Sequence, residues 1–536
     1  MIILPKTIKC DLRRDFCYNE GELMIRQVSY MLNNGQDLAP LVEAICHRIN
    51  ANYLPFHMPG HKGGAGVTDR WRKITGGSLA LDLTEVEGLD DLHNPHGVIK
   101  SAQELAASLM GSEAAFFLVN GATGGILASI LALCRKGEKI IIPRHAHRSV
   151  YSGIVLSGAK PVYIGSKISP EWGIPLGVEH DHVTAVLQAN KDAQCLVMVH
   201  PTYHGLTSDL SRIVDTACCN NVPVVVDEAH GAHFKFSPGL SETAMSCGAA
   251  LAVQGWHKTM GALTQSGMLL LKDKRINIED YLMALQSTSP SYLLMASLDE
   301  ARRNWAVNGT EIMDRVLELT RYFRKEVKNI KGITCLNREL LLDYSVVRNL
   351  DPTKLVVSAR EMGLNGFQLA SELRERYKIE PEMAEFTAVT LMVTIGDTRE
   401  TVGCLLSALK DLSGRYWGQK DKIRENFPYP PIPQMMVLPG EAVKLPKRNV
   451  AFNDAVGEIS AEYVCPYPPG IPLVVPGEVI TEEIVEITKL TLALGGWIQG
   501  LRDSANEMWQ VIDAWQGNLF LLRVRTVPES QLRSGY

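Results

Sequence analysis

The chain has 536 residues, of which 46% are hydrophobic and 21% charged, and its formal net charge at pH 7 is −5. This length and apolar content predict a globular protein of roughly two to four domains with large buried cores. The slight acidic excess argues against a nucleic-acid partner, because nucleic-acid-binding domains usually present a basic face.

No segment of the sequence predicts membrane insertion or export. The longest apolar run, residues 125–134, is far shorter than the ~20 residues that a membrane-spanning helix requires. The apolar start, residues 1–4, is too short for a secretory signal, and the acidic residues after it do not fit a transit peptide. Eleven scattered cysteines without a Cys-x-x-Cys pair indicate free thiols in a reducing compartment. We therefore expect a cytoplasmic protein without a membrane partner.

The first half of the chain predicts a helical segment followed by a large α/β domain. Residues 20–50 show helical spacing of apolar positions, and the Gly- and Pro-rich residues 55–64 predict a loop. From about residue 115, short β-rich runs alternate with helix-like stretches. These runs cover residues 115–119, 139–143, 161–164, 195–199, 222–226, 249–253 and 267–271. Seven such runs joined by crossovers predict a mainly parallel sheet covered on both faces, with ligands at the carboxyl ends of its strands.

The second half predicts two smaller parts. Residues 293–327 predict a long helix, and the β-rich runs after it are typical of a smaller α+β domain; these runs are residues 332–336, 354–358 and 388–395. The Pro-rich residues 428–433 predict a linker. A last helix is expected to begin near Thr481, whose hydroxyl can cap it. We expect the aromatic residues of the tail to cover a hydrophobic surface; these are Trp509, Trp515 and Phe520.

We therefore expect four parts along the chain. They are an N-terminal helical arm (residues 1–50), a large cofactor-binding domain (51–295), a small α+β domain (296–425), and a C-terminal domain with a tail (426–536).

Asp227 and Lys258 each follow a β-rich run, so both are expected at the rim of the sheet where strands end. The 258 − 227 = 31 positions between them suffice for a loop, a crossover helix and a return strand. An acid and an amine at neighbouring strand ends suit a cofactor with a cationic ring and an aldehyde. Pyridoxal 5′-phosphate fits, because an aspartate keeps its ring nitrogen protonated and a lysine forms a Schiff base with its aldehyde. The alternative is that Lys258 serves only in an ion pair.

A phosphate site and a ring contact are expected at other strand ends. Residues 121–125 join a strand to an apolar helix, so their backbone amides and the Thr123 hydroxyl can hold a phosphate, although glycine-rich turns also occur for steric reasons alone. Histidines recur on several of these loops without a sequence-local ligand set, which favours no metal site. We expect His147 to stack over the cofactor ring and His230 to support Asp227.

With these residues in place, the chain resembles the Orn/Lys/Arg decarboxylase family of pyridoxal-phosphate enzymes, which has the aspartate aminotransferase (type I) fold. The resemblance spans about residues 50–480 and is greatest to the short biosynthetic, arginine decarboxylase-like type that lacks an N-terminal wing domain. Its motifs are residues 55–64, 82–85, 88–92, 227–231, 257–259, 287–290 and 468–472.

The resemblance implies roles for individual residues. Lys258 would bind the cofactor covalently, Asp227 would pair with its ring nitrogen, and His147 would stack on the ring with His230 beside it; Lys258, Asp227 and His147 would be catalytic. The other cofactor-binding residues implied are Gly121, Ala122, Thr123, Thr202, His257, Ser287 and Thr288.

Gly255 departs from the family pattern, because family members usually carry a serine three positions before the lysine. One hydroxyl at the phosphate is therefore expected to be missing. Either Thr123, or Ser287 or Thr288 of the partner subunit, compensates, or the affinity for the cofactor is lower.

The implied reaction is the decarboxylation of a basic amino acid, with L-arginine converted to agmatine and CO2 in polyamine biosynthesis. Lysine and ornithine are alternative substrates. Asp91 and Glu478 are candidates to bind the distal cation of the substrate. The implied assembly is a homodimer or a higher homo-oligomer with shared active sites. Another type I reaction, such as transamination, and an inactive regulatory homologue both stay open.

Overall fold

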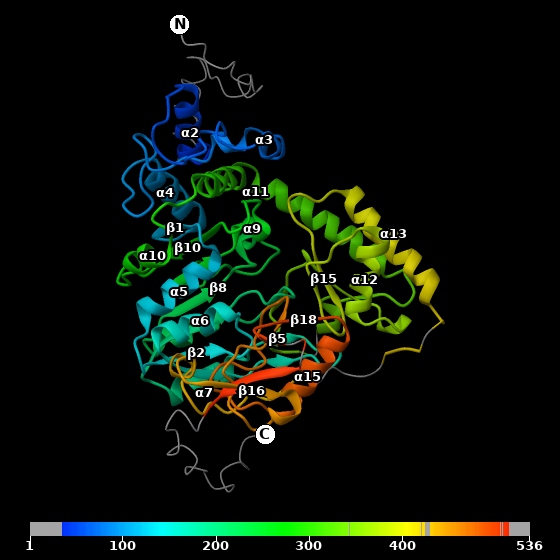
Figure 1. Cartoon of the computed structure of the whole chain (residues 1–536). Coiled ribbons are helices and arrows are strands. Elements are labelled where there is room, and N and C mark those ends of the chain that lie inside the picture. The colour runs from blue at the N-terminus through cyan, green and yellow to red at the C-terminus, as the bar shows by residue number, and fades with distance from the viewer. Residues whose placement is uncertain are drawn as a thin grey trace. The chain divides into compact units, whose positions relative to one another are not determined.

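The computed structural model describes residues 35–341, 344–419, 421–423, 429–503, 505 and 507–513 (Figure 1). Within these residues the chain forms two compact units. The first unit is drawn from residues 1–128 and 227–315, and the second from residues 129–226 and 316–536. The four-part division expected from the sequence stays a prediction.

The main sheet has seven strands in the order β1-β10-β9-β8-β6-β2-β3. Strand β2 is parallel to both β3 and β6, whereas β10 is antiparallel to both β1 and β9. All seven β-rich runs of the sequence are strands of this sheet, so the predicted α/β fold is confirmed. The strands are β1 (Ala114–Leu118), β2 (Lys139–Pro143), β3 (Lys160–Ile164), β6 (Ala193–Val199), β8 (Val224–Asp227), β9 (Leu251–Gln254) and β10 (Gly267–Leu271).

Two connections in this sheet differ from the prediction. A crossover helix was expected between Asp227 and the strand before Lys258, but this stretch holds only the 3₁₀ helix η3 (Ala232–Phe236). Pro238 and Gly239 come one residue after the end of η3, and neither residue favours the interior of a longer helix. The second difference is the link from β9 to β10, which contains the one-turn helix α9 (Trp256–Thr259) and returns the chain in the antiparallel direction.

In the first unit, helix α4 (Val98–Met110) packs against β1 and against α2 (Pro40–Asn50). Its buried side chains include Ile99, Ala102 and Ala106, which recur at helical spacing and so line one face. Helix α2 confirms part of the helical segment expected for residues 20–50, of which residues 20–34 lie outside the described residues. Besides α9, the other α-helices that begin in this unit are α3 (Asp69–Thr75), α5 (Gly121–Leu133), α10 (Glu279–Leu285) and α11 (Tyr292–Val327).

In the second unit, a four-stranded sheet has the order β11-β13-β15-β14. Its strands are β11 (Thr334–Cys335), β13 (Lys354–Ser358), β14 (Met383–Ala384) and β15 (Val389–Met392), and its neighbours in the chain are helices α12 (Gly366–Tyr377) and α13 (Arg399–Tyr416). The predicted long helix and the three β-rich runs after it are therefore confirmed. This unit also contains helices α6 (Arg148–Ser157), α7 (His180–Ala189) and α8 (Leu210–Cys219).

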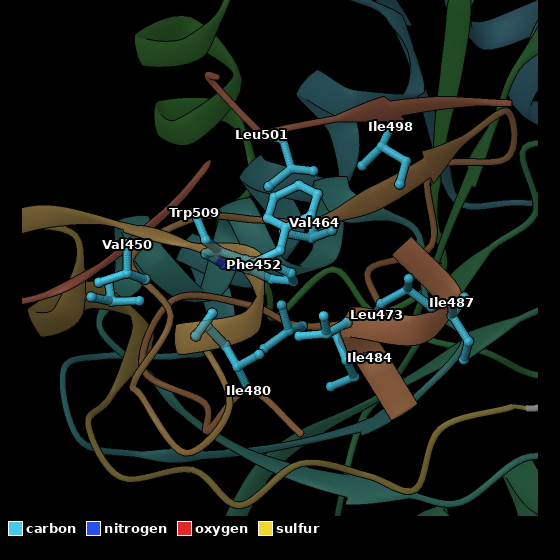
Figure 2. Close-up of a cluster of buried hydrophobic side chains, with 14 residues drawn as sticks. Val450, Phe452, Val464, Leu473, Ile480, Ile484, Ile487, Ile498, Leu501 and Trp509 are labelled. Atoms are coloured by element: carbon cyan, nitrogen blue, oxygen red, sulfur yellow. The ribbon is translucent and has the colours of Figure 1, made fainter. Parts of the chain in front are cut away.

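The C-terminal part of the second unit has its own hydrophobic core, which Figure 2 shows. Trp509 is buried there, and its ring centroid lies 5.8 Å from that of Phe452. Helix α15 (Glu482–Ala493) begins as predicted, because the Thr481 side chain accepts the Ile484 N–H. The expectation that Trp509 covers a hydrophobic surface is confirmed, while Trp515 and Phe520 lie outside the described residues. Two strand pairs complete this part: β16 (Lys447–Ala451) with β19 (Met508–Ile512), and β17 (Cys465–Tyr467) with β18 (Trp497–Gln499).

Among the described residues, no helix combines the length and the apolar character that crossing a bilayer demands. The cysteines of the described chain carry free thiols.

Candidate active site

Lys258 lies on α9, four positions beyond the end of β9. Its Nζ atom is 2.9 Å from Nε2 of His230. Asp227 ends β8 and is only 6% exposed, and its Oδ1 accepts the Ala229 N–H at 3.2 Å. Burial raises the pKa of Asp227, and the positive charge of Lys258 acts against this shift. The structure therefore brings Asp227, His230 and Lys258 together within the first unit. The expectation that His230 supports Asp227 stays a prediction, and the structure adds the contact between its ring and the Lys258 amine.

The residues expected to hold a phosphate also meet in the first unit. Gly121 begins α5 with φ +68°, and its N–H donates to the Gln265 carbonyl oxygen at 2.8 Å. The backbone N–H of His257 donates to the next carbonyl, that of Ser266, and the His257 Nδ1 atom lies 2.8 Å from the same oxygen. Gly121 and His257 thus bond to the carbonyl oxygens of two adjacent residues, Gln265 and Ser266.

A close backbone approach completes this arrangement. Gly267 follows Ser266, and a Cβ atom on Gly267 would lie 3.1 Å from the Ala122 nitrogen. The first amides of a helix have no acceptor within the helix, so the start of α5 offers N–H donors and a positive dipole end to an anion. Thr123 is exposed on this first turn. The start of α5 is therefore suited to a phosphate group.

His147 and Thr202 belong to the second unit. His147 caps α6, because its Nδ1 accepts the Ser149 N–H at 3.2 Å. Gly470 packs on the other side of the ring, where a Cβ atom would lie 3.3 Å from His147 Nε2. The Thr202 hydroxyl oxygen accepts the Leu206 N–H at 3.1 Å. The ring plane of His147 is thus fixed by contacts on two sides.

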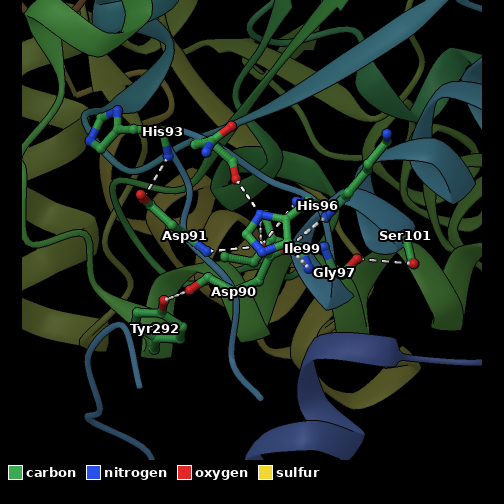
Figure 3. A network of polar contacts seen from close by, with 10 residues as sticks. Asp90, Asp91, His93, His96, Gly97, Ile99, Ser101 and Tyr292 are labelled. Carbon is green, nitrogen blue, oxygen red and sulfur yellow. Dashed lines mark hydrogen bonds and ion pairs between the residues drawn. The ribbon is translucent and has the colours of Figure 1, made fainter. Parts of the chain in front are cut away.

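Asp91 lies in a loop that the neighbouring Asp90 organises (Figure 3). The Asp90 carboxylate accepts backbone N–H groups of residues 96, 97 and 99 at 2.8–3.0 Å, at the start of α4. Burial acts to raise the pKa of Asp90, but the N–H donors outweigh it, so the pKa lies below its ordinary value. The Tyr292 hydroxyl donates to the Asp90 carbonyl oxygen at 2.5 Å. Asp90 could not be recognised as a cap from the sequence, because it stands eight positions before Val98, the first residue of α4.

The same loop reaches the residues expected to serve a neighbouring subunit. The Asp91 carboxylate accepts the His93 N–H at 2.9 Å, and His93 Nε2 lies 2.7 Å from the Ser287 carbonyl oxygen. Ser287 and Thr288 are both exposed. The Ser287 hydroxyl oxygen accepts the Ser289 N–H at 3.1 Å.

Glu478, the other candidate for the substrate cation, is fully buried in the second unit. Its carboxylate forms an ion pair with Arg144 at 3.2 Å and accepts the Val475 N–H at 2.9 Å. Burial raises the pKa of Glu478, and the positive charge of Arg144 opposes this shift. Because its charge is already matched by Arg144, the geometry favours a structural role for Glu478.

Comparisons with known proteins agree along almost the whole chain. Residues 39–401 match the model of the Orn/Lys/Arg decarboxylase major domain, and residues 429–501 match that of the C-terminal domain. An arginine decarboxylase of Bacillus anthracis is 37% identical over 482 residues, which cover 89% of this chain and 98% of the relative. An arginine decarboxylase of Halalkalibacterium halodurans is 38% identical over 485 residues, with the same two coverages.

Solved structures show the same fold. The crystal structure of a lysine decarboxylase from Francisella novicida matches with a TM-score of 0.78 at 20% identity, covering 95% of this chain and 87% of that one. The constitutive lysine decarboxylase of Escherichia coli matches with a TM-score of 0.75 at the same identity, with 95% and 88% covered. The fold, the grouping of Asp227 with Lys258, and the two family models all agree, and the chain belongs to the Orn/Lys/Arg decarboxylase family.

Proposed function

We propose that this protein uses pyridoxal 5′-phosphate to decarboxylate L-arginine to agmatine and CO2, as a step in polyamine biosynthesis. The observation that carries the proposal is the placement of Lys258 beside His230 and the buried Asp227. Arginine is preferred because the arginine decarboxylases compared above are 37% and 38% identical over 98% of their own length. Lysine is the second candidate, since the solved structures of similar fold are lysine decarboxylases at 20% identity.

The residues of the first unit fit this cofactor. A buried carboxylate such as Asp227 needs a cationic partner, and a protonated pyridine nitrogen is one. Lys258 would hold the aldehyde carbon, and the start of α5 would hold the phosphate together with His257. His147 and Thr202 of the second unit stay proposed contacts, as do Ser287 and Thr288 of the partner subunit. When bound, the cofactor supplies a sink for the electron pair released as CO2 leaves.

His230 and Lys258 are proposed to carry out the proton transfers of the reaction. An amine attacks a carbonyl only in its neutral form, and His230 at 2.9 Å can take a proton from Lys258 Nζ. The same amine can later return a proton to the α-carbon of the product. We propose that Asp91 binds the distal cation of the substrate. Its carboxylate suits a guanidinium, which binds carboxylates with two parallel hydrogen bonds.

A second copy of the chain is part of the proposal. Large apolar side chains are exposed within residues 53–74 of the first unit, among them Phe56 at 90% and Leu54 at 73% exposure. Exposed apolar patches of this kind mark interaction surfaces. We propose that a homodimer or a higher homo-oligomer with shared active sites covers them, and that the enzyme works in the cytoplasm.

The test is to incubate the purified enzyme with pyridoxal phosphate and with arginine, lysine or ornithine in separate reactions. Agmatine and an equal amount of CO2 are expected from arginine, and borohydride reduction should label Lys258 with the cofactor. A keto acid in place of CO2 would indicate transamination. A protein without visible cofactor absorbance and without product would be an inactive homologue.

A further inference from the structure

Gly255 leaves no room for a side chain beside Lys258. A Cβ atom at this position would lie 2.9 Å from the Ala229 carbonyl oxygen and 3.2 Å from the Lys258 Cδ atom. The Gly255 backbone, with φ −94° and ψ 85°, lies outside the left-handed region, so the neighbours impose this limit. A serine here would push either on the backbone that follows Asp227 or on the Lys258 side chain.

Trp256, the next residue, is completely buried and ends a chain of polar contacts in the first unit. Its indole N–H donates to Gln254 Oε1 at 2.9 Å, and Gln254 Nε2 donates to Glu228 Oε2 at 2.7 Å. The other carboxylate oxygen of Glu228 accepts the Ala244 N–H at 2.8 Å. These contacts join the turn before Lys258 to the residue that follows Asp227.

The hydrogen bonds from Trp256 through Gln254 to Glu228 allow only one orientation of the Gln254 amide. An indole N–H can only donate, so Gln254 must present its oxygen to Trp256 and its NH2 group to the carboxylate of Glu228. If the amide were rotated, two donors would face each other at Trp256, and buried polar groups without partners are costly. The geometry around Trp256 is therefore specified by hydrogen bonding as well as by shape.

Helix α9 depends on such an anchor because it is only four residues long. An isolated turn of helix is not stable by its own hydrogen bonds. Along α9, the Lys258 N–H donates to the Gly255 carbonyl oxygen and the Met260 N–H donates to the Trp256 carbonyl oxygen, both at 2.9 Å. The buried indole thus stands at the start of the turn that presents the Lys258 amine.

We propose that Trp256 is a positioning residue for the cofactor: through Gln254 and Glu228, it holds the turn that carries Lys258 against the strand end that carries Asp227. Gly255 keeps the space into which Lys258 packs. This anchor takes the place of a serine hydroxyl at position 255, which this chain cannot accommodate without displacing Lys258 or Ala229. The inference rests on the proposed use of pyridoxal phosphate.

The experiment compares the affinity for pyridoxal phosphate of the full-length protein and its variants by absorbance titration. Trp256→Phe keeps a buried ring but removes the indole N–H, and we expect the dissociation constant to rise about tenfold, which corresponds to about 1.4 kcal/mol. The pH at which the visible absorbance of the bound cofactor changes should also shift, because the Lys258 amine moves relative to His230. The matched control is Trp509→Phe, which removes an indole N–H bond to Ser460 in the second unit. It should lower the melting temperature and leave the affinity within about twofold of wild type.

Variants of Gly255 test the inference independently of Trp256. Gly255→Ser and Gly255→Ala should both weaken cofactor binding, because the added Cβ atom is the cause. Tighter binding by Gly255→Ser would overturn the inference, and so would unchanged affinity of folded Trp256→Phe. Where Trp256→Phe does not fold, Gln254→Met cuts the same chain of contacts, and an unchanged affinity of that variant would count equally against it. If wild-type Lys258 takes up no cofactor, the proposed function fails instead.

Discussion

Glu228 should make the stability of the protein depend on pH in a predictable direction. Its carboxylate is completely buried, and burial raises its pKa from 4.5 to about 7, although hydrogen bonds from Gln254 and Ala244 act in the opposite direction. The shift is 7 − 4.5, or about 2.5 units, and each unit corresponds to about 1.4 kcal/mol. The residue is therefore expected to account for about 3 kcal/mol of stability change across this pH range.

The sign follows from where the proton is held. Below pH 4.5, Glu228 is protonated in both the folded and the unfolded chain, and its contribution is fully present. As the pH rises toward 7, the unfolded chain loses this proton while the folded chain keeps it, so folding becomes less favourable. Above about 7 the loss is complete.

Glu228→Gln tests this reasoning. The free energy of unfolding of the cofactor-saturated protein is measured by urea denaturation between pH 5 and 8, alongside wild type. At pH 5 the variant should be about as stable as wild type, because the protonated Glu228 carboxyl already turns an O–H toward one of its two donors, as the amide of the variant does. Between pH 5 and 8 it should gain about 2 to 3 kcal/mol relative to wild type. Two parallel curves would refute the argument. The control is Glu318→Gln, which removes an exposed carboxylate from α11.

Four further outcomes are expected. Lys258→Ala should keep the melting temperature within a few degrees of wild type and abolish both CO2 release and borohydride labelling; residual labelling at another lysine would contradict the assigned role. Asp90→Ala removes the acceptor for the first N–H groups of α4, so urea denaturation should show a loss of about 1–2 kcal/mol, whereas Asp69→Ala on the exposed helix α3 should cost less. Glu478→Gln leaves Arg144 buried without a counter-charge and should cost about 3–5 kcal/mol with little change in the KM for arginine. Asp91→Asn should instead raise the KM for arginine. If Glu478→Gln raised this KM and Asp91→Asn did not, Glu478 would be the residue that binds the substrate cation.

Much of the fold could be predicted from local sequence. The seven strands were found because each is a short apolar run bounded by turn residues, and burial on both faces makes such runs continuous. The direction of β10 could not be found in this way, since an apolar run reads the same for parallel and antiparallel strands. The chain reverses through α9 within the residues between Gln254 and Gly267, and only the three-dimensional pairing shows this.

The site could be predicted where the chemistry lies directly at a strand end. Asp227 and Lys258 were identified because each follows a buried run closely. The contact of His230 with Lys258 could not be predicted, because it joins residues 28 positions apart and depends on how the turns after β8 and β9 fold. For Glu478, the sequence could not show that the carboxylate already has a partner. Its side chain type suits a basic substrate, but the buried Arg144 that pairs with it lies 334 positions away in sequence.

Asp227 and Glu228 show how one strand end can serve two purposes. Consecutive side chains on an extended backbone point to opposite sides. Asp227 accordingly feels the charge of Lys258, while Glu228 accepts hydrogen bonds from Gln254 and Ala244. Because Gln254 in turn accepts the Trp256 indole N–H, both acids interact with the turn that carries Lys258. Asp227 does so through the charge of Lys258, and Glu228 through the hydrogen bonds of Gln254. A displacement of β8 would therefore move Asp227, the acid proposed to pair with the cofactor ring, together with the hydrogen-bonded contacts that hold the Lys258 turn.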